Sequence, residues 1–193
     1  MERRQKLTPV VEEIRQYFLN CVEKTRVDHP KVSFYIDHVT EVEKWAKYIL
    51  KDHPEANSET VLLAVWLHDI GNLIGDRKID HAIRSEREAR LILPEMGLSP
   101  EEVDAVAHCV RAHRNNDVPP YTVEAKIVAA ADSASHMTGE AYLVFAGRND
   151  IEGSIAKLER DYRDIGLVPN LQEVLTPFYQ AWKELLKVYP KFD

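Results

Sequence analysis

The sequence predicts an all-α protein with a single domain. Apolar residues recur at helical spacing through most of the 193 residues, and no segment stands out with the alternating pattern of a strand. Ser99-Pro100-Glu101-Glu102 combines a capping serine, a proline in the first turn and a glutamate three residues after the cap, which is a strong helix start. No repeat, low-complexity tract or long linker divides the chain, and its length suits one core.

The first three helices are expected over about 8–26, 33–52 and 59–70. The first ends before Asp28-His29-Pro30 and the second is stopped by His53-Pro54, because proline cannot continue a helix. Ser58 is expected to cap the third helix and Gly71 to terminate it. A loop with two glycines follows over about 71–80.

The next three helices are expected over about 81–96, from the Ser99 cap to about 114, and over about 123–138. Asp80 can cap the first of them, and Gly97 occupies the position just after its end. Thr122 opens the third, which Gly139 closes. Each helix in this part of the chain therefore has a start and a stop signal of its own.

The C-terminal part is expected to hold helices over about 151–165 and 171–188, and the segment 140–150 is ambiguous. Gly166 stops the first of these helices, and Asn170-Leu171-Gln172-Glu173 has the pattern of a capping box for the second. Pro177 either kinks this last helix or delays its start. The aromatic residues are expected to cover the core or to help form a homodimer surface: Tyr142, Phe145, Phe178, Tyr179, Trp182 and Tyr189.

Composition limits the partners and the compartment. The net charge of −7 argues against a general nucleic-acid surface or an anionic-membrane surface, since either needs a basic face. The N-terminus lacks the apolar core of a signal peptide, and no apolar stretch approaches membrane-spanning length. Only Cys21 and Cys109 are present, so a reducing compartment is expected and the sequence predicts a cytoplasmic protein.

His68 and Asp69 are the most informative pair in the chain. They follow the apolar run 61–67 directly and precede Ile70-Gly71. An imidazole and a carboxylate at the end of a hydrophobic helix contribute little to packing, and a metal ion would explain them. The dipeptide is common by chance, so the interpretation depends on the other acidic and histidine residues.

Several of those residues lie on apolar helix faces. Residues three, four and seven apart share a face of a helix, and by that measure His38, His68, His113 and Asp132 all point to the side of apolar packing residues. A carboxylate there is costly unless it is paired or binds a metal. One core histidine alone is more often a hydrogen-bonded packing residue, but joint occurrence reverses that preference. Imidazole and carboxylate without thiolate suit Mn²⁺, Fe²⁺, Co²⁺, Ni²⁺ or Zn²⁺ better than Mg²⁺ alone.

The remaining histidines are weaker candidates. His81 opens its helix beside the glycine-containing loop, which is a plausible edge of an active site. His108 is rotated away from His113 onto a more polar face and is expected to lie outside the ligand set. His136, one turn after Asp132, either lines the same cleft or is a satisfied polar residue, whereas His29 and His53 precede prolines and are expected to be exposed.

These residues resemble the HD-domain superfamily of metal-dependent phosphohydrolases. The likeness rests on the order of His38, His68-Asp69 and Asp132 along the chain. It also rests on the sequence segments around them: Phe34-Tyr35-Ile36-Asp37-His38-Val39, Ala64-Val65-Trp66-Leu67-His68-Asp69-Ile70-Gly71 and Lys126-Ile127-Val128-Ala129-Ala130-Ala131-Asp132. It implies an orthogonal helical bundle whose metal is held by His38, His68, Asp69 and Asp132. The HD core would span about 30–140, with a C-terminal helical extension over about 140–193 in the same domain.

Some members of that superfamily hold two metals, and His81 and His113 match the positions of the additional ligands. Asp69 would then bridge the ions. Several two-metal members have a lysine directly after the Ile-Gly of this motif, where this chain has Asn72, so the positive charge is missing or has moved. Arg114 follows His113 where the cyclic-dinucleotide branch typically has a second histidine, so that specificity is not assigned.

The resemblance implies hydrolysis of a phosphate ester or anhydride in a small phosphorylated molecule, with a nucleotide as the preferred substrate. A bound metal supplies an activated water and charge stabilisation, and Asp69 and His68 are the residues expected to carry catalysis. Arg84 and Arg114 are the preferred phosphate-binding residues, because arginine suits bidentate phosphate recognition. Two alternatives stay open: a non-catalytic nucleotide-sensing module that keeps the metal pocket, and a di-iron oxygenase on the same fold.

Overall fold

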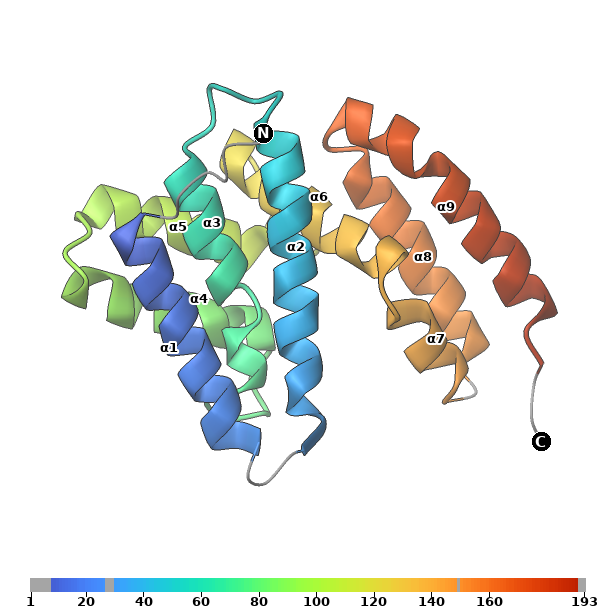
Figure 1. Ribbon diagram of the computed structural model, residues 1–193, viewed down its shortest axis with the longest axis horizontal. Helices are drawn as coiled ribbons and strands as arrows, with labels where there is room; N and C mark the ends of the chain where they lie inside the picture. The colour runs from blue at the N-terminus through green and yellow to red at the C-terminus, as the bar shows by residue number, and fades with distance from the viewer. Residues whose placement is uncertain (1–7, 27–29, 149, 191–193) are drawn as a thin grey trace, which may run out of the picture.

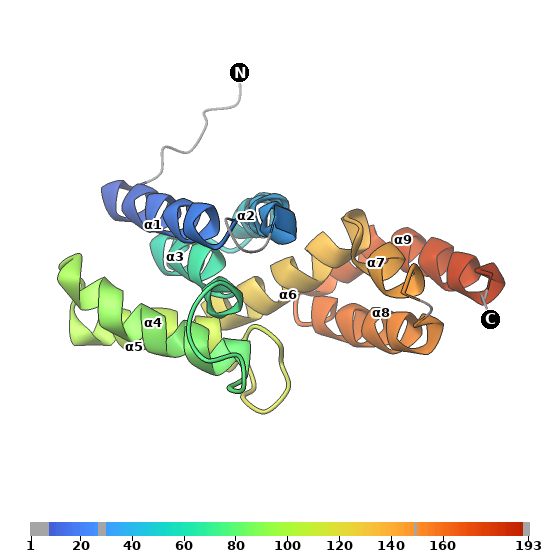
Figure 2. The same cartoon turned by 90° about the horizontal axis from the view of Figure 1, so that it is seen from below.

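The computed structural model describes residues 8–26, 30–148 and 150–190, and within these ranges it contains helices and no strands. In chain order the elements are α1 (Pro9–Arg26), the 3₁₀ turn η1 (Pro30–Ser33), α2 (Phe34–Leu50), α3 (Ser58–Leu67), the 3₁₀ turn η2 (Ile70–Asn72), α4 (His81–Glu95), α5 (Pro100–Ala112), α6 (Val123–Thr138), α7 (Ala141–Ala146), α8 (Ile151–Ile165) and α9 (Pro169–Val188). The all-α prediction is confirmed. Figure 1 and Figure 2 show α6 in the middle, with α1 to α5 on one side and α7 to α9 on the other.

The core is built around α3, a short helix that is apolar on every side. All residues from Thr60 to Leu67 are buried. A helix without a polar face must be covered all round, and α3 packs against α1, α2, α5 and α6. The end of α3 is therefore held inside the protein, so the residues that follow it, His68 and Asp69, also lie in the interior.

The C-terminal helices dock on α6. The indole Nε1 of Trp182 in α9 donates a hydrogen bond to the carbonyl of Met137 in α6 at 2.8 Å. The same indole packs edge-on against the fully buried ring of Tyr142, with 5.2 Å between ring centroids. Tyr162 and Tyr179 stack between α8 and α9 at 4.0 Å. Most of the predicted aromatic residues therefore do cover the core, while Phe178 is exposed.

Three expected helix ends are wrong. Asn57, not Ser58, caps α3: its side chain accepts hydrogen bonds from the backbone N–H groups of Glu59 and Thr60. The helix also ends at Leu67, before Gly71. Likewise α9 begins at Pro169 without a side-chain cap, so the capping box predicted at 170–173 does not form. The helix starts earlier because proline is favoured at the first helical position.

The other start signals are confirmed, whereas Pro177 lies inside α9 and does not delay its start. Ser99 and Glu102 form the reciprocal capping box of α5, and Asp80 and Thr122 cap α4 and α6. The bounds expected for the helices over 123–138 and 151–165 coincide with α6 and α8. The ambiguous segment 140–150 contains the short helix α7.

We expect replacement of Asn57 with alanine to lower the free energy of unfolding by about 1 kcal/mol, because two backbone N–H groups at the start of α3 lose their acceptor. Ser58→Ala is the matched control and is expected to be neutral. Urea denaturation of both variants measures the difference. Equal losses at the two positions would contradict this description of the cap.

None of the helices in the described ranges combines the length and the apolar character needed to cross a bilayer.

Candidate metal centre

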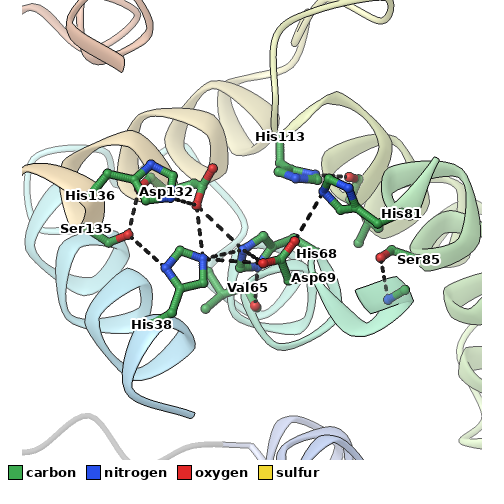
Figure 3. Close-up of polar contacts among 12 residues, drawn as sticks. His38, Val65, His68, Asp69, His81, Ser85, His113, Asp132, Ser135 and His136 are labelled. Carbon is green, nitrogen blue, oxygen red and sulfur yellow. Dashed lines mark hydrogen bonds and ion pairs between the residues drawn. The ribbon is translucent and has the colours of Figure 1, made fainter. Parts of the chain in front are cut away.

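The predicted site residues meet in the interior, between the ends and middles of several helices. His38 comes from α2, His68 and Asp69 follow α3, His81 begins α4, His113 ends α5, and Asp132 lies in α6. Their side chains point toward one another (Figure 3). Segments that are up to about a hundred residues apart therefore supply a single cluster of imidazoles and carboxylates.

The first group of donor atoms surrounds His38. Its Nε2 lies 3.2 Å from His68 Nε2 and 3.3 Å from Asp132 Oδ1. It lies 3.6 Å from Asp69 Oδ2, and His68 Nε2 is 3.7 Å from Asp132 Oδ1. Each of the two carboxylate oxygens therefore lies within 4.0 Å of both imidazole nitrogens. The donor atoms of His38, His68 and Asp69 lie within 4.8 Å of one another, and so do those of His38, Asp132 and His136.

The second group shares Asp69 with the first. One donor atom from each of Asp69, His81 and His113 lies within 4.8 Å of the others. Asp69 Oδ1 faces His81 Nε2 at 3.3 Å, while its Oδ2 faces His38. The two oxygens of one carboxylate therefore serve two separate groups, as a bridging ligand would.

Backbone carbonyls fix how the rings of His68 and His113 are oriented. The Nδ1 of His68 lies 2.7 Å from the carbonyl of Val65, and the Nδ1 of His113 lies 2.7 Å from the carbonyl of Val110. A carbonyl can only accept a hydrogen bond, so each Nδ1 carries the proton and each Nε2 keeps a free lone pair. This arrangement is common around metal-binding histidines.

Ser135 orients His38 in the same way. Its hydroxyl donates to the carbonyl of Asp132 at 2.7 Å, so its oxygen accepts from His38 Nδ1 at 3.3 Å. In the neutral rings the Nε2 lone pairs of His38 and His68 face each other at 3.2 Å, and either a proton on one nitrogen or a metal ion bound by both relieves their repulsion. The donor set fits a divalent transition metal for this reason as well as by ligand type.

The electrostatics of the centre agree with that fit. Burial alone would raise the pKa of Asp132, but His136, His38 and His68 outweigh it and hold that pKa well below its usual range. The pKa of Asp69 is lowered against burial by His68, His38 and two further histidines. Burial lowers the pKa of His113 to about 4 and, with Arg114, lowers that of His81. Charged carboxylates and neutral imidazoles are the protonation states that bind metals.

The other histidines divide as follows. His108 lies outside the centre as predicted, stacked on Tyr121 with 3.7 Å between ring centroids. His53 contacts Glu55, and His29 lies outside the described residues. His136 does reach the centre: its Nε2 is 3.6 Å from Asp132 Oδ1, and its ring stacks on His38 at 5.2 Å.

Helix α8 adds residues that sequence reasoning missed. The buried carboxylate of Asp161 places Oδ2 3.3 Å from His136 Nδ1, and the hydroxyl of Tyr142 donates to the same oxygen at 2.9 Å. The Nζ of Lys157 lies 3.0 Å from His136 Nδ1 and 3.2 Å from Asp161. The only signal in the sequence is the spacing of Lys157 and Asp161, which share a helix face, and such pairs are usually on the surface.

The two predicted phosphate-binding arginines are engaged elsewhere. Arg84 lines a cavity of about 880 Å³ that opens on the centre, but its Nε and one terminal nitrogen donate to the carbonyls of Ile79 and Ile74 at 3.0 and 2.7 Å. Arg114 is paired with Asp80 at 2.6 Å. Phosphate binding by Arg84 and Arg114 stays a prediction.

Comparison with known proteins gives three findings. The sequence model of the HD domain family matches residues 35–137. Ribonuclease Y of Thermoanaerobacter pseudethanolicus is 37% identical over 94 residues, which are 49% of this chain and only 16% of that protein's length. The crystal structure of a predicted HD superfamily hydrolase from an uncultured Thermotogales bacterium is similar, with a TM-score of 0.55, 23% identity, and coverage of 86% of this chain and 92% of the other. At that identity, the structural likeness shows the fold alone.

Proposed function

Since the chain belongs to the HD-domain family, we propose that it is a metal-dependent phosphohydrolase that cleaves a phosphate ester or anhydride of a small phosphorylated molecule. The observation that carries the proposal is the convergence of Nε2 and carboxylate oxygen atoms around His38 and around Asp69. The Nε2 atoms of His38 and His68 lie 3.2 Å apart in the interior, and a metal ion bound by both would account for this contact together with the two carboxylates beside it.

We assign the ligands in two groups. His38, His68, Asp69 and Asp132 would hold one ion, and Asp69, His81 and His113 a second. The donor set suits Mn²⁺, Fe²⁺, Co²⁺, Ni²⁺ or Zn²⁺. Such metals polarise a phosphoryl oxygen and acidify a water when bound. Asp69 sets the spacing of the groups through its two oxygens, and the carbonyl of Val65 keeps the His68 lone pair directed at the centre.

We also propose a nucleotide as the substrate. The cavity of about 880 Å³ has aromatic side chains, Phe34, Tyr35 and Phe145, on which a base can stack, and the cations Arg77 and Arg148 for phosphate. The similar protein named ribonuclease Y supports a phosphate ester as the bond that is cleaved.

A metal analysis and a hydrolysis screen test the function together. Anaerobically purified protein is expected to contain a divalent transition metal, and the loaded protein to release phosphate or a nucleotide product from members of a nucleotide and phosphate-ester panel. The chelated protein is the control, with at least about a hundredfold lower rate. Thermal stabilisation by nucleotides without turnover would instead indicate a sensing module, and oxygen uptake with reduced iron would indicate an oxygenase.

We propose a cytoplasmic location as well, which agrees with two buried cysteines, Cys21 and Cys109, that are both free thiols. A homodimer stays a prediction, for which light scattering after gel filtration is the measurement.

A further inference from the structure

An ion pair joins the two helix ends that carry His81 and His113. Asp80 lies directly before His81 at the start of α4, and Arg114 lies directly after His113 at the end of α5. The Nη1 of Arg114 donates to Asp80 Oδ2 at 2.6 Å. The rings of the two histidines are 5.5 Å apart between their centroids. The ion pair therefore spans the same gap between α4 and α5 as the second ion that we assign to these histidines.

Asp80 connects this ion pair to the backbone of α4. Its Oδ1 accepts a hydrogen bond from the Ala82 N–H at 2.8 Å and so caps the helix, while its Oδ2 faces Arg114. One carboxylate thus ties the first turn of α4, which begins with His81, to the end of α5. The chain that connects the two helices, residues 96–99, lies at their opposite ends. The ends that carry the ligands are therefore held by side-chain contacts and by the packing of α4 against α5.

The α5 side of the ion pair is anchored by the next residue. Asn115 has a φ of 44°, in the left-handed region, which asparagine adopts more readily than most residues. Its Nδ2 donates to Oδ1 of the buried Asp164 in α8 at 2.8 Å. Because α8 holds the chain directly after Arg114, a pull through the ion pair acts mainly on the start of α4. His81 is the ligand whose place then depends on this pair.

We propose that Asp80 and Arg114 are positioning residues that set the distance between His81 and His113 and thereby the affinity of the second ion. The inference rests on the two-ion assignment in the proposed function and adds two residues that act through the ligands. Groups that orient metal ligands typically change metal affinity when they are replaced. Arg114 thus has a different role from phosphate binding, because its guanidinium already has a carboxylate partner.

The sign of the effect separates positioning from the action of charge alone. Through its field, the Asp80 carboxylate attracts a cation and the Arg114 guanidinium repels one. On that basis Asp80→Asn would weaken binding of the second ion and Arg114→Met would tighten it. Positioning predicts that both variants weaken it, because each breaks the same contact. Asparagine caps a helix about as well as aspartate, so Asp80→Asn keeps the cap of α4.

Calorimetric titration of the metal-free full chain with Co²⁺ measures both affinities. Asp80→Asn and Arg114→Met are each expected to raise the Kd of the second ion about tenfold and to leave that of the first within about twofold. The double variant should bind the second ion no more weakly than Asp80→Asn alone, and Arg114→Lys should recover part of the loss. Asp104→Asn, which breaks the pair of Asp104 with Arg90 on the same two helices, is the matched control and leaves both affinities unchanged.

Urea midpoints of the metal-free variants are expected to stay close to the wild-type value, since half-exposed ion pairs add little to folding. Tighter or unchanged binding of the second ion in Arg114→Met would overturn the inference and leave the metal assignment standing. A higher substrate KM in Arg114→Met at an unchanged second Kd would also overturn it, because that result identifies a phosphate-binding residue. A wild-type chain that binds a single Co²⁺ ion would overturn the inference together with the second ligand group, whereas hydrolysis with that one ion would still support the proposed function.

Discussion

Replacement of Asp69 with alanine is expected to reduce the number of bound ions from two to at most one and to lower metal-dependent hydrolysis by more than about a hundredfold. The reason is geometric, since Asp69 Oδ2 faces His38 and Asp69 Oδ1 faces His81. Changes to groups that merely support a ligand typically cost 10–100-fold in metal affinity. Loss of the shared carboxylate removes one ligand from each group, so its effect should be larger.

Elemental analysis and kcat/KM measure the two parts of this prediction. Thermal unfolding with and without metal adds an independent readout, because a ligand that binds only the folded protein stabilises it by mass action, about 2.7 kcal/mol at a hundred times Kd. Wild-type protein should show that gain and Asp69→Ala should lose most of it. Asp52→Ala, at an exposed position after α2, is the matched control. Two bound ions and a near-normal rate in Asp69→Ala would mean that this carboxylate only balances the charge of nearby histidines.

Much of this site could be predicted from sequence because helix geometry is regular. His38 and Asp132 repeat with apolar neighbours at spacings of three and four residues, so their direction toward the core follows from the period of the helix. His68 was placed by the same spacing, and the fully buried end of α3 before it holds it in the interior. The family resemblance then strengthened the assignment of His81, which begins its helix and does not lie on an apolar helix face that would predict burial.

The residues that were missed depend on how helices dock. Lys157 and Asp161 reach His136, which was already a weaker candidate from sequence, because α8 packs against α6, and nothing local in α8 encodes that contact. Arg84 shows a different effect: it was selected for its positive charge, but its guanidinium donates to carbonyls of the loop that precedes α4. The predicted start of α3 was wrong for a simpler reason. Asn57 and Ser58 are both good caps, and composition cannot decide between two neighbouring cap positions.

Gly71 has a different role in the structure from the one that its sequence position suggests. Sequence patterns suggest a helix terminator, yet α3 ends four residues earlier and Gly71 lies in η2. The absence of a side chain at Gly71 allows the backbone to pack closely against α4. A Cβ atom at this position would lie 2.2 Å from the carbonyl oxygen of His81 and 2.9 Å from the backbone nitrogen of Ser85. Both are backbone atoms, so no side-chain rotation can relieve the contact.

We therefore expect Gly71→Ala to lower the free energy of unfolding by about 1–3 kcal/mol through overpacking. The methyl group must push the start of α4 away, and His81 moves with it, while the hydrogen bond from Gly71 N–H to Ser85 Oγ, 2.9 Å long, is strained. Affinity for the second ion, assigned to Asp69, His81 and His113, should fall at least about tenfold, and affinity for the first should change less.

Urea denaturation and calorimetric metal titration check the two effects of Gly71→Ala. Gly147→Ala is the matched control, because Gly147 has helical backbone angles and a Cβ there would lie 3.1 Å from the carbonyl oxygen of Leu143 and 4.0 Å from that of Val144, with no closer atom. That change should fall between a slight loss and a gain of up to about 1 kcal/mol. Wild-type affinity for both ions in a destabilised Gly71→Ala protein would contradict the prediction, because it would mean that the start of α4 moves without displacing His81.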